Sequence, residues 1–261
     1  MTVRTYGSYL KIDELLSLQQ PVSEGPEHDE MLFIVIHQVY ELWFKQMLWE
    51  VDWLRTALIQ GELARSMSAF KRMLTILKTL VAQIDVLETM TPVDFNSFRA
   101  RLDSASGFQS AQFREFEFAL GHRRRGPLAQ MPPGSPELAR LEQRLTEPSL
   151  YEAYLRFLAS RGYAIPRDLF ERDRSLPIPE DERVRAQLVL VYREDPAVRE
   201  LSERLVDLDE GLQEWRYRHV KMVQRTIGTK RGTGGSAGAE YLKTTLFQPL
   251  FADLWAIRSE L

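Results

Sequence analysis

The feature that most constrains the fold of this chain is a helical apolar pattern that runs from Asp29 to about Gln60. Apolar side chains fall on more than one face of this segment: Phe33, Ile36, Tyr40, Phe44, Met47, Val51 and Leu54. A helix that is apolar around much of its circumference belongs at the centre of a protein. The apolar run 31–36 also precedes His37, so we expect its imidazole to leave water and to need a structural partner, a metal or a ligand.

The same periodicity continues through most of the 261 residues, and no alternating strand pattern persists. We expect a second long helix over Glu62–Met90, antiparallel to the first because only Gly61 separates them, and a third over Pro196–Ile227. Shorter helices are expected over the following segments: Ile12–Leu18, Pro92 through Phe98, Phe108–Leu120, Glu137–Leu145, Leu150–Arg161, Asp181–Arg193 and Ala239–Ile257, with Gln248-Pro249 able to interrupt the last.

Three segments lack this periodicity. We expect a solvated loop over His122–Pro136, a proline-punctuated connection over Ile165–Pro179 and a glycine-rich loop over Gly228–Gly238. None of them is a clean linker between two domains. The sequence therefore predicts a single all-α domain over residues 1–261, with three long helices and a smaller helical excursion over 122–180.

Composition excludes several classes of function. The net charge is −3, which argues against a nucleic-acid binder, because such proteins carry a basic excess or stripe. The chain has no cysteine, which excludes disulfides, thiolate zinc sites, thiolate-ligated haem and cysteine nucleophiles. The start lacks the apolar core of a secretory signal, and no apolar run approaches the roughly 20 residues of a membrane span. We therefore expect a cytoplasmic protein that binds no membrane.

Two of the four histidines could carry chemistry. His122 stands beside three arginines and is expected to be solvated, while His28 begins the first long helix. His37 and His219 each lie on an apolar helix face, where a lone histidine is more often a satisfied core residue than a ligand. The stripe around His219 consists of Leu208, Leu212, Trp215, Met222 and Thr226. A single neutral imidazole between apolar walls is nevertheless what a haem iron requires.

Spacing tests the alternative metals. Di-iron bundles need Glu-x-x-His pairs, and none of the four histidines has a glutamate three residues earlier. The zinc-protease pattern His-Glu-x-x-His is absent as well. Haem needs only one axial protein ligand, so it survives a test that zinc and di-iron fail.

The loop Lys230–Gly238 is the second unusual segment. It has neither the Gly-Lys-Ser/Thr of a phosphate-binding loop nor the preceding strand of a dinucleotide fingerprint. It is either a flexible connection or a ligand loop, in which glycine N–H groups, Thr233 and adjacent cations grip an anionic or zwitterionic ligand. We favour the ligand loop.

Arginines near both histidines are candidate anion ligands. Arg99 follows two aromatic residues, Phe95 and Phe98, and its guanidinium can bond both oxygens of a carboxylate. Four cations surround His219 in the sequence: Arg216, Arg218, Lys221 and Arg225. Most would form a solvated face, and one or two could pair with haem propionates.

At these residues the chain resembles the tryptophan 2,3-dioxygenase family. The matching segments follow in order along the chain from residue 5 to about 240: Thr5–Leu10, His28–Trp43, Leu87–Pro92, Phe95–Arg99, Ser106–Ser110, Trp215–His219 and Lys230–Gly238. Together they are far more specific than any one of them.

The resemblance implies an enzyme with one haem b per subunit that inserts both atoms of O2 across the C2–C3 bond of the L-tryptophan indole, giving N-formyl-L-kynurenine. His219 would be the axial iron ligand, with Trp215 and Met222 beside the haem, and His37 would be the catalytic histidine near the indole N–H. The substrate would contact the following residues: Phe33, Ile34, Val35, Ile36, His37, Phe95, Arg99, Gly232, Thr233 and Gly234.

Arg99 would bind the substrate carboxylate, and Thr233 its ammonium or carboxylate. Phe95 stands where some family members have tyrosine, so a hydroxyl is missing there. The resemblance also implies a homotetramer in which the amino-terminal segment 1–20 packs on a neighbouring subunit. Tyr6, Tyr9 and Leu10 would then complete the pocket of that neighbour.

Two other interpretations remain open. One is a haem enzyme of the same fold that acts on another indole or aromatic substrate. The other is a helical scaffold whose histidines are core residues. A Soret band in the purified protein would exclude the scaffold, and formation of N-formylkynurenine would separate the two enzymes.

Overall fold

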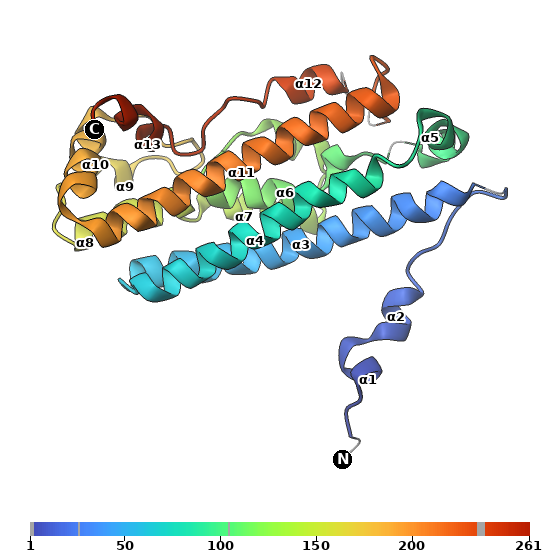
Figure 1. The fold of residues 1–261 in the computed structure, drawn as a ribbon, viewed down its shortest axis with the longest axis horizontal. Coiled ribbons are helices and arrows are strands. Elements are labelled where there is room, and N and C mark those ends of the chain that lie inside the picture. The colour runs from blue at the N-terminus through green and yellow to red at the C-terminus, as the bar shows by residue number, and fades with distance from the viewer. Residues whose placement is uncertain (1–2, 26, 104, 234–237) are drawn as a thin grey trace.

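Three long helices form the frame of the protein (Figure 1). The computed structural model describes residues 3–25, 27–103, 105–233 and 238–261. In these ranges the chain forms helices and no strand, so the all-α prediction is confirmed. The long helices are α3 (His28–Ile59), α4 (Leu63–Leu87) and α11 (Pro196–Ile227), within a few residues of their predicted ends. Helix α4 packs against both α3 and α11.

The link between α3 and α4 is tight. Gly61 has a φ of 75°, a left-handed conformation that glycine adopts at little cost, so the chain reverses within a few residues. Helix α3 buries side chains three or four residues apart, including Tyr40, Phe44 and Met47. Leu42, Trp49 and Trp53 of the same helix stay exposed in the single chain. The apolar circumference of α3 is thus only partly covered by the rest of the chain.

The remaining helices are short. They are α1 (Tyr6–Leu10), α2 (Ile12–Leu16), α5 (Pro92–Arg99), α6 (Ala111–Leu120), α7 (Pro136–Thr146), α8 (Leu150–Ser160), α9 (Asp168–Glu171), α10 (Glu182–Glu194), α12 (Ala239–Lys243) and α13 (Ala252–Ala256), with 3₁₀ turns at Ala100–Leu102, Gly107–Gln109, Gly126–Gln130 and Ile257–Ser259. Helix α6 begins three residues later than predicted, because the Ser110 hydroxyl caps it by accepting the N–H of Phe113 at 3.2 Å.

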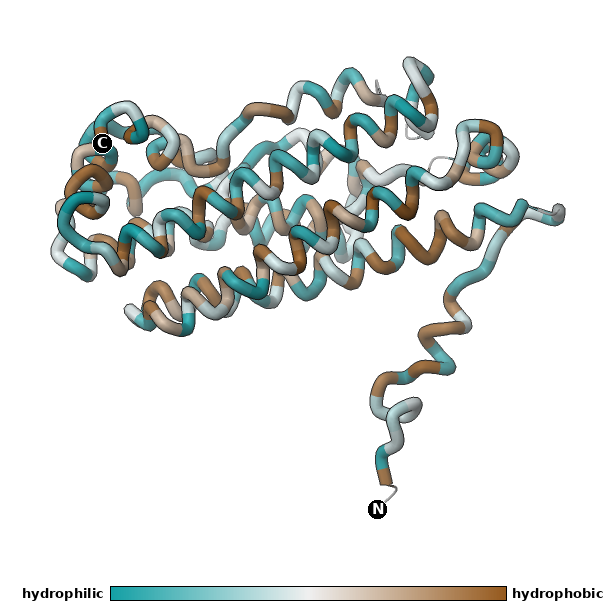
Figure 2. The backbone as a smooth tube through the Cα atoms, viewed as in Figure 1, coloured by the Kyte–Doolittle hydropathy of each residue, from teal (hydrophilic) through white to brown (hydrophobic). Residues whose placement is uncertain are grey.

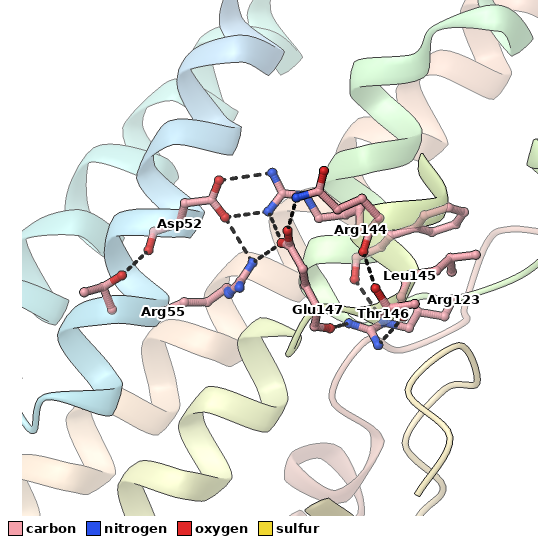
Figure 3. Close-up of polar contacts among 10 residues, drawn as sticks. Asp52, Arg55, Arg123, Arg144, Leu145, Thr146 and Glu147 are labelled. Atoms are coloured by element: carbon pink, nitrogen blue, oxygen red, sulfur yellow. Dashed lines mark hydrogen bonds and ion pairs between the residues drawn. The ribbon is translucent and has the colours of Figure 1, made fainter. Parts of the chain in front are cut away.

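Ion pairs attach α7 to the long helix α3 (Figure 3). The guanidinium of Arg144 in α7 donates to both carboxylate oxygens of Asp52 in α3, at 2.6 and 3.0 Å. Arg55 donates to the same Asp52 at 3.0 Å and to Glu147 at 3.3 Å. The first part of the predicted excursion is therefore fixed to the frame by side chains from both elements.

The segment 122–136 is only partly the solvated loop that its composition predicts. Arg123 is 3% exposed, and the segment contains the 3₁₀ turn Gly126–Gln130. The Arg123 guanidinium donates to the backbone carbonyls of Phe118, Leu145, Glu147 and Arg174. Carbonyls at helix ends lack partners within the helix, so a buried guanidinium with five donors is stabilised here. The arginine is structural, so the prediction is wrong for the start of the segment, whereas Pro132, Pro133 and Gly134 are exposed as predicted.

The carboxyl-terminal helix is broken more widely than predicted. Helix α12 ends at Lys243 and α13 begins at Ala252. Between them the Gln213 side chain of α11 binds the backbone of Phe247 and Gln248, at 3.2 and 2.7 Å. Asp209, one turn earlier in α11, accepts the N–H groups of Leu250 and Phe251. These side chains replace the helical hydrogen bonds, and the segment runs along α11 as an extended strap (Figure 1).

The amino-terminal segment with α1 and α2 projects away from the other helices (Figure 1). Figure 2 shows hydrophobic stretches along this segment. Its leucines Leu15, Leu16 and Leu18 are all exposed. Within the described parts of the chain, no helix combines the length and the apolar character needed to cross a membrane.

Candidate active site

A cavity of about 260 Å³ lies where the three long helices meet α5 and α6. Phe33 and His37 line it from α3, and Trp215 and His219 line it from α11. Helix α4 adds apolar residues such as Leu87. The two histidines that the sequence singles out are therefore brought to one cavity from helices that are far apart in the chain.

His37 presents a hydrogen-bond acceptor to this cavity. Its Nδ1 lies 2.7 Å from the backbone carbonyl of Phe33, one helical turn earlier, and the two rings are 4.1 Å apart. A carbonyl oxygen only accepts, so Nδ1 carries the proton and Nε2 keeps a free lone pair. Desolvation lowers the pKa of His37, against the opposing effects of the Phe33 carbonyl and of Glu41. The ring is consequently neutral at physiological pH. The residue is nevertheless exposed in the single chain, so its imidazole has not left water as the sequence predicts.

His219 has the features of a metal ligand. Its ring stacks on Trp215, with 5.2 Å between centroids and 6° between planes. Burial lowers the pKa of His219 to about 4, so the imidazole is neutral at physiological pH. No hydrogen bond to this ring occurs within the described ranges. In the same ranges, no three His, Asp or Glu side chains gather as they would to hold an ion by themselves. The arrangement suits one axial ligand to a cofactor metal.

Trp215 is itself held by aromatic edges. Tyr40 and Phe44 of α3 meet its ring at 64° and 86°, and Phe113 of α6 lies 5.0 Å away. Aromatic pairs favour such edge contacts. The plane of Trp215, and with it the plane of His219, is therefore fixed by side chains of α3 and α6.

Arg99 and the loop after α11 form a further part of the cavity lining. Arg99 of α5 lines the cavity and donates through Nη2 to the backbone carbonyl of Arg231. Thr233 lines the cavity too, and its hydroxyl donates to the carbonyl of Ala105. These two contacts join α5 and the turn that follows it to the loop after α11.

Gly238 closes the base of this loop. Its φ is 57°, and a Cβ built on it would lie 2.8 Å from the Lys230 carbonyl oxygen. Only glycine allows the two ends of the loop to approach so closely. Gly232 lines the cavity, whereas the predicted ligand residue Gly234 lies outside the described residues.

A buried ionic cluster forms another wall of the cavity. Glu117 of α6 is 1% exposed and accepts from Arg114 at 2.7 Å, Arg124 at 3.0 Å and Arg216 at 2.9 Å. Burial by itself would raise the pKa of Glu117, but the three guanidinium groups outweigh it and lower the pKa to about 2. Burial lowers the pKa of the neighbouring His122 to about 4, so this ring adds no charge at neutral pH. Three cations face one anion, which leaves a positive surplus beside the cavity.

The other arginines around His219 have different roles. Arg218 binds Asp85 at 2.6 Å and Glu88 at 3.2 Å, and Arg225 binds the same Glu88 at 3.4 Å. These pairs join α11 to α4 outside the cavity. Of the four cations that the sequence places near His219, Arg216 is the one that lines it.

The structure brings most of the predicted site residues together, but not all. Phe95, Trp215 and Met222 line the cavity along with the residues above. Ile34, Val35 and Ile36 do not, because residues between positions i and i+4 of a helix point to other faces: Ile36 is buried in the core and Val35 is exposed.

Residues outside the cavity include the amino-terminal group. Tyr6 is 77%, Tyr9 69% and Leu10 44% exposed, and none of them lines the cavity of its own chain. The His28 side chain is 96% exposed and contacts Asp29. The expectation that His122 is solvated is wrong, since it packs beside Glu117.

Several cavity residues were missed by the sequence interpretation. They are Glu41, Arg114, Glu117 and Tyr241. The i, i+3 spacing of Arg114 and Glu117 was visible, but the same spacing is common on solvated helix faces. Only the packing of α6 against α3 and α7, with Arg216 of α11 bound to Glu117, shows that this pair is buried.

The fold and the cavity define a class: an all-α protein in which two helices each present one histidine to a shared, largely apolar cavity. The sequence profile described as tryptophan 2,3-dioxygenase matches residues 1–129 and 149–261. The chain belongs to the tryptophan 2,3-dioxygenase family, as the sequence resemblance predicts.

Individual relatives cover nearly the whole chain. A protein of Herpetosiphon aurantiacus named tryptophan 2,3-dioxygenase is 58% identical over 98% of this chain and 98% of its own length. Proteins with the same name from Anaeromyxobacter sp. strain K and Nocardioides sp. are 57% and 47% identical, each over 98% of this chain, and the matches span 96% and 94% of their own lengths. The family profile omits residues 130–148, which contain α7.

Proposed function

We propose that this chain is a haem-dependent dioxygenase that inserts O2 across the C2–C3 bond of the L-tryptophan indole and forms N-formyl-L-kynurenine. Membership of the family and the names of the close relatives support the reaction. The observation that carries the proposal is the pair of imidazoles, His37 and His219, that line one cavity from α3 and α11.

The residues present fit a haem group. His219 offers a neutral imidazole without a hydrogen-bond partner in the described ranges, on an apolar wall that includes Trp215 and Met222. The surplus positive charge around Glu117, through Arg114 and Arg216, suits the two propionates of haem b. In this proposal His219 would hold the iron of one haem b in each subunit.

Haem supplies the binding and activation of O2, which no side chain can perform. The chain's own residues supply placement. Arg99 offers two parallel N–H donors to the substrate carboxylate, and the Thr233 hydroxyl is an added partner for the carboxylate or the ammonium. Both groups now bond backbone carbonyls, and substrate would exchange these bonds for its own.

At the other end of the substrate, Phe33 and Phe95 give an apolar wall for the indole. Their rings are 5.8 Å apart, and Phe98 packs on both. Nε2 of His37 accepts the indole N–H, because Nδ1 is committed to the Phe33 carbonyl. The proposed polar contacts at both ends fix the orientation of the amino acid, and the aromatic walls exclude water from the ring.

We also propose a cytoplasmic homotetramer in which Tyr6, Tyr9 and Leu10 reach the cavity of a neighbouring subunit. Two observations support this arrangement: these side chains are exposed, and the segment that carries them projects from its own chain (Figure 1). An isolated segment of this kind buries too little apolar surface to be stable alone.

The test is a spectrum and a product assay on the same preparation. Protein purified from haem-replete cells is expected to show a strong Soret band, and the reduced protein is expected to convert L-tryptophan and O2 to N-formylkynurenine. A colourless preparation would contradict the haem proposal and leave the scaffold interpretation. A coloured protein that oxidises a substituted indole but not tryptophan would overturn the proposed substrate.

A further inference from the structure

One carboxylate in the cavity has no role in the proposed reaction. Glu41 lines the cavity and follows His37 by one helical turn on α3. Residues four apart on a helix are neighbours, with about 5–6 Å between their Cβ atoms. Glu41 is therefore the acidic group of α3 that lies nearest to the His37 ring along the helix.

Gln112 of α6 holds Glu41 in place. Its side-chain amide donates to the backbone carbonyl of Glu41 at 3.0 Å and to the carboxylate at 2.8 Å. Within the described ranges, the Glu41 carboxylate has no other hydrogen bond and no ion pair. A neutral amide fixes the position of this carboxylate but leaves its charge uncompensated.

Other charged and titratable groups face His37 across the cavity. They are Arg99 from α5, Arg114 and Glu117 from α6, Arg216 and His219 from α11, and the phenols of Tyr40 from α3 itself and Tyr241 from α12. Glu117 is neutralised by its arginines, and Arg99 is bonded to a backbone carbonyl. Of the two carboxylates that line the described cavity, only Glu41 lacks a cationic partner. Its charge favours the protonated form of His37, opposing the effect of desolvation.

We propose that Glu41, held by Gln112, is a positioning residue that strengthens Nε2 of His37 as the acceptor for the ring N–H of the substrate. As this N–H is bound, positive charge develops on the imidazole, and a fixed carboxylate one turn away stabilises that charge. The inference rests on the proposed function. It adds a role for Glu41 and Gln112, two residues that the proposed reaction does not otherwise use.

The first experiment compares Glu41→Gln with the wild type in the haem-loaded full chain. Removal of the carboxylate lowers the pKa of His37, so kcat at neutral pH is expected to fall roughly tenfold, the equivalent of one pKa unit, while KM changes less than about twofold. The acid limb of the pH profile is expected to move to lower pH, because a His37 with a lower pKa becomes protonated only at a lower pH. A merely structural defect would lower activity at every pH and would not move this limb.

Two variants serve as controls. Glu41→Asp keeps the charge and is expected to restore the position of the acid limb. Glu210→Gln removes the same charge from an exposed position of α11 outside the cavity, and its profile is expected to match the wild type. An unchanged acid limb in Glu41→Gln, or an equal shift in Glu210→Gln, would overturn the proposal.

A second readout does not depend on turnover. The imidazole of His37 is titrated by NMR in the haem-free full chain, with its signal assigned by His37→Asn. Its pKa is expected to fall in Glu41→Gln and also in Gln112→Leu, in which the carboxylate is no longer held. Equal pKa values in all three proteins would refute the role of Glu41. If the wild type fails to oxidise tryptophan, the proposed function fails, and this titration still decides the role of Glu41.

Discussion

At the scale of single residues, the two histidines of the cavity have different surroundings, and these surroundings suit them to different roles. His37 has one nitrogen bound to the Phe33 carbonyl, so it is prepared to accept one hydrogen bond. His219 is stacked on Trp215, and no hydrogen bond to its ring occurs within the described ranges, so it is prepared to bind a metal. The contact that each ring already makes decides what its free nitrogen can bind. For His37 this contact is a hydrogen bond to a carbonyl, and for His219 it is stacking on a tryptophan ring.

These roles predict different losses. His219→Ala is expected to abolish stable haem binding, whereas His37→Ala is expected to retain haem and lose most of its turnover, by about 10²–10⁴-fold if the N–H contact acts in the rate-limiting step. Haem content from the Soret absorbance and kcat with tryptophan measure the two effects. Normal haem affinity in His219→Ala would refute the axial assignment.

Arg99 is expected to act in binding. Arg99→Ala removes charge-assisted hydrogen bonds worth about 1.5–3 kcal/mol, so KM for tryptophan is expected to rise roughly 10- to 100-fold. Haem content should be unchanged. The matched control is Arg101→Ala, which removes an arginine two residues away that pairs with Glu27 outside the cavity. An equal rise in KM in both variants would remove the specific role of Arg99.

The sequence predicts the location of a residue correctly when that location depends on spacing along a single helix. The one-turn interval between Phe33 and His37 places both on one face, and the structure brings both to the cavity. Burial of Arg123 could not be predicted in this way, because its carbonyl partners include Leu145 and Arg174, far along the chain. A run of arginines has the same composition whether it is solvated or holds helix ends together.

At the scale of elements, α4 and α11 approach so closely that one side chain is excluded. A Cβ on Gly211 of α11 would lie 2.7 Å from Cδ2 of Leu77, a buried residue of α4. The contact fixes the distance between two helices that both line the cavity. Apolar periodicity predicts that such helices pack, but it does not give the spacing between them.

The close approach of Gly211 can be tested by a double-mutant cycle. Gly211→Ala is expected to lower the free energy of unfolding by about 1–3 kcal/mol through overpacking, although alanine favours helix more than glycine does. In a Leu77→Ala background the clash is absent, and the same substitution is expected to raise stability by about 0.5–1 kcal/mol. Denaturant unfolding of the four proteins measures both values, and a change of the same sign in both backgrounds would contradict the contact.

The long helices were predicted to within a few residues because each satisfies one period over many turns. The region after α11 was predicted less well. Its backbone is held by side chains of α11, Asp209 and Gln213, and the sequence between Lys243 and Ala252 gives no sign of these tertiary partners. A helix shows its apolar period in its own residues, whereas a segment held by tertiary hydrogen bonds does not show its partners, so its conformation is not predicted from its own sequence.

At the scale of the whole molecule, buried histidines make stability depend on pH. Burial lowers the pKa values of His122 and His219 to about 4, whereas the unfolded chain titrates near the ordinary value of 6.5. Between these values the unfolded state binds protons that the folded state does not, so stability is lost as the pH falls from about 6.5 toward 4. Each group contributes a slope of up to about 1.4 kcal/mol per pH unit.

His122 allows this slope to be checked without changing a proposed haem ligand. In the haem-free full chain, urea unfolding at pH 7.5, 6 and 5 is expected to show falling stability, and His122→Asn is expected to flatten the curve by about one proton. The carboxylate of Glu117, with its pKa lowered to about 2, adds to the loss only below its unfolded value of 4.5. Equal slopes in the two proteins would contradict the burial of a neutral His122.

A complementation experiment distinguishes two arrangements. Either the amino-terminal segments are exchanged between subunits, as proposed, or each segment completes the cavity of its own chain. One variant, Tyr6→Ala with Tyr9→Ala, keeps an intact cavity but loses the segment's side chains. The second, His37→Ala, keeps the segment but has an inactive cavity. Each protein alone is expected to have little activity.

If subunits exchange segments, refolding or co-expressing the two together places intact segments of the second beside intact cavities of the first, and part of the activity is expected to return. Two chains that each use their own segment cannot complement in this way, because one cavity always lacks Tyr6 and Tyr9 and the other always lacks His37. Activity in the mixed preparation no higher than in the separate ones would therefore overturn the exchange, provided that size-exclusion chromatography shows mixed oligomers.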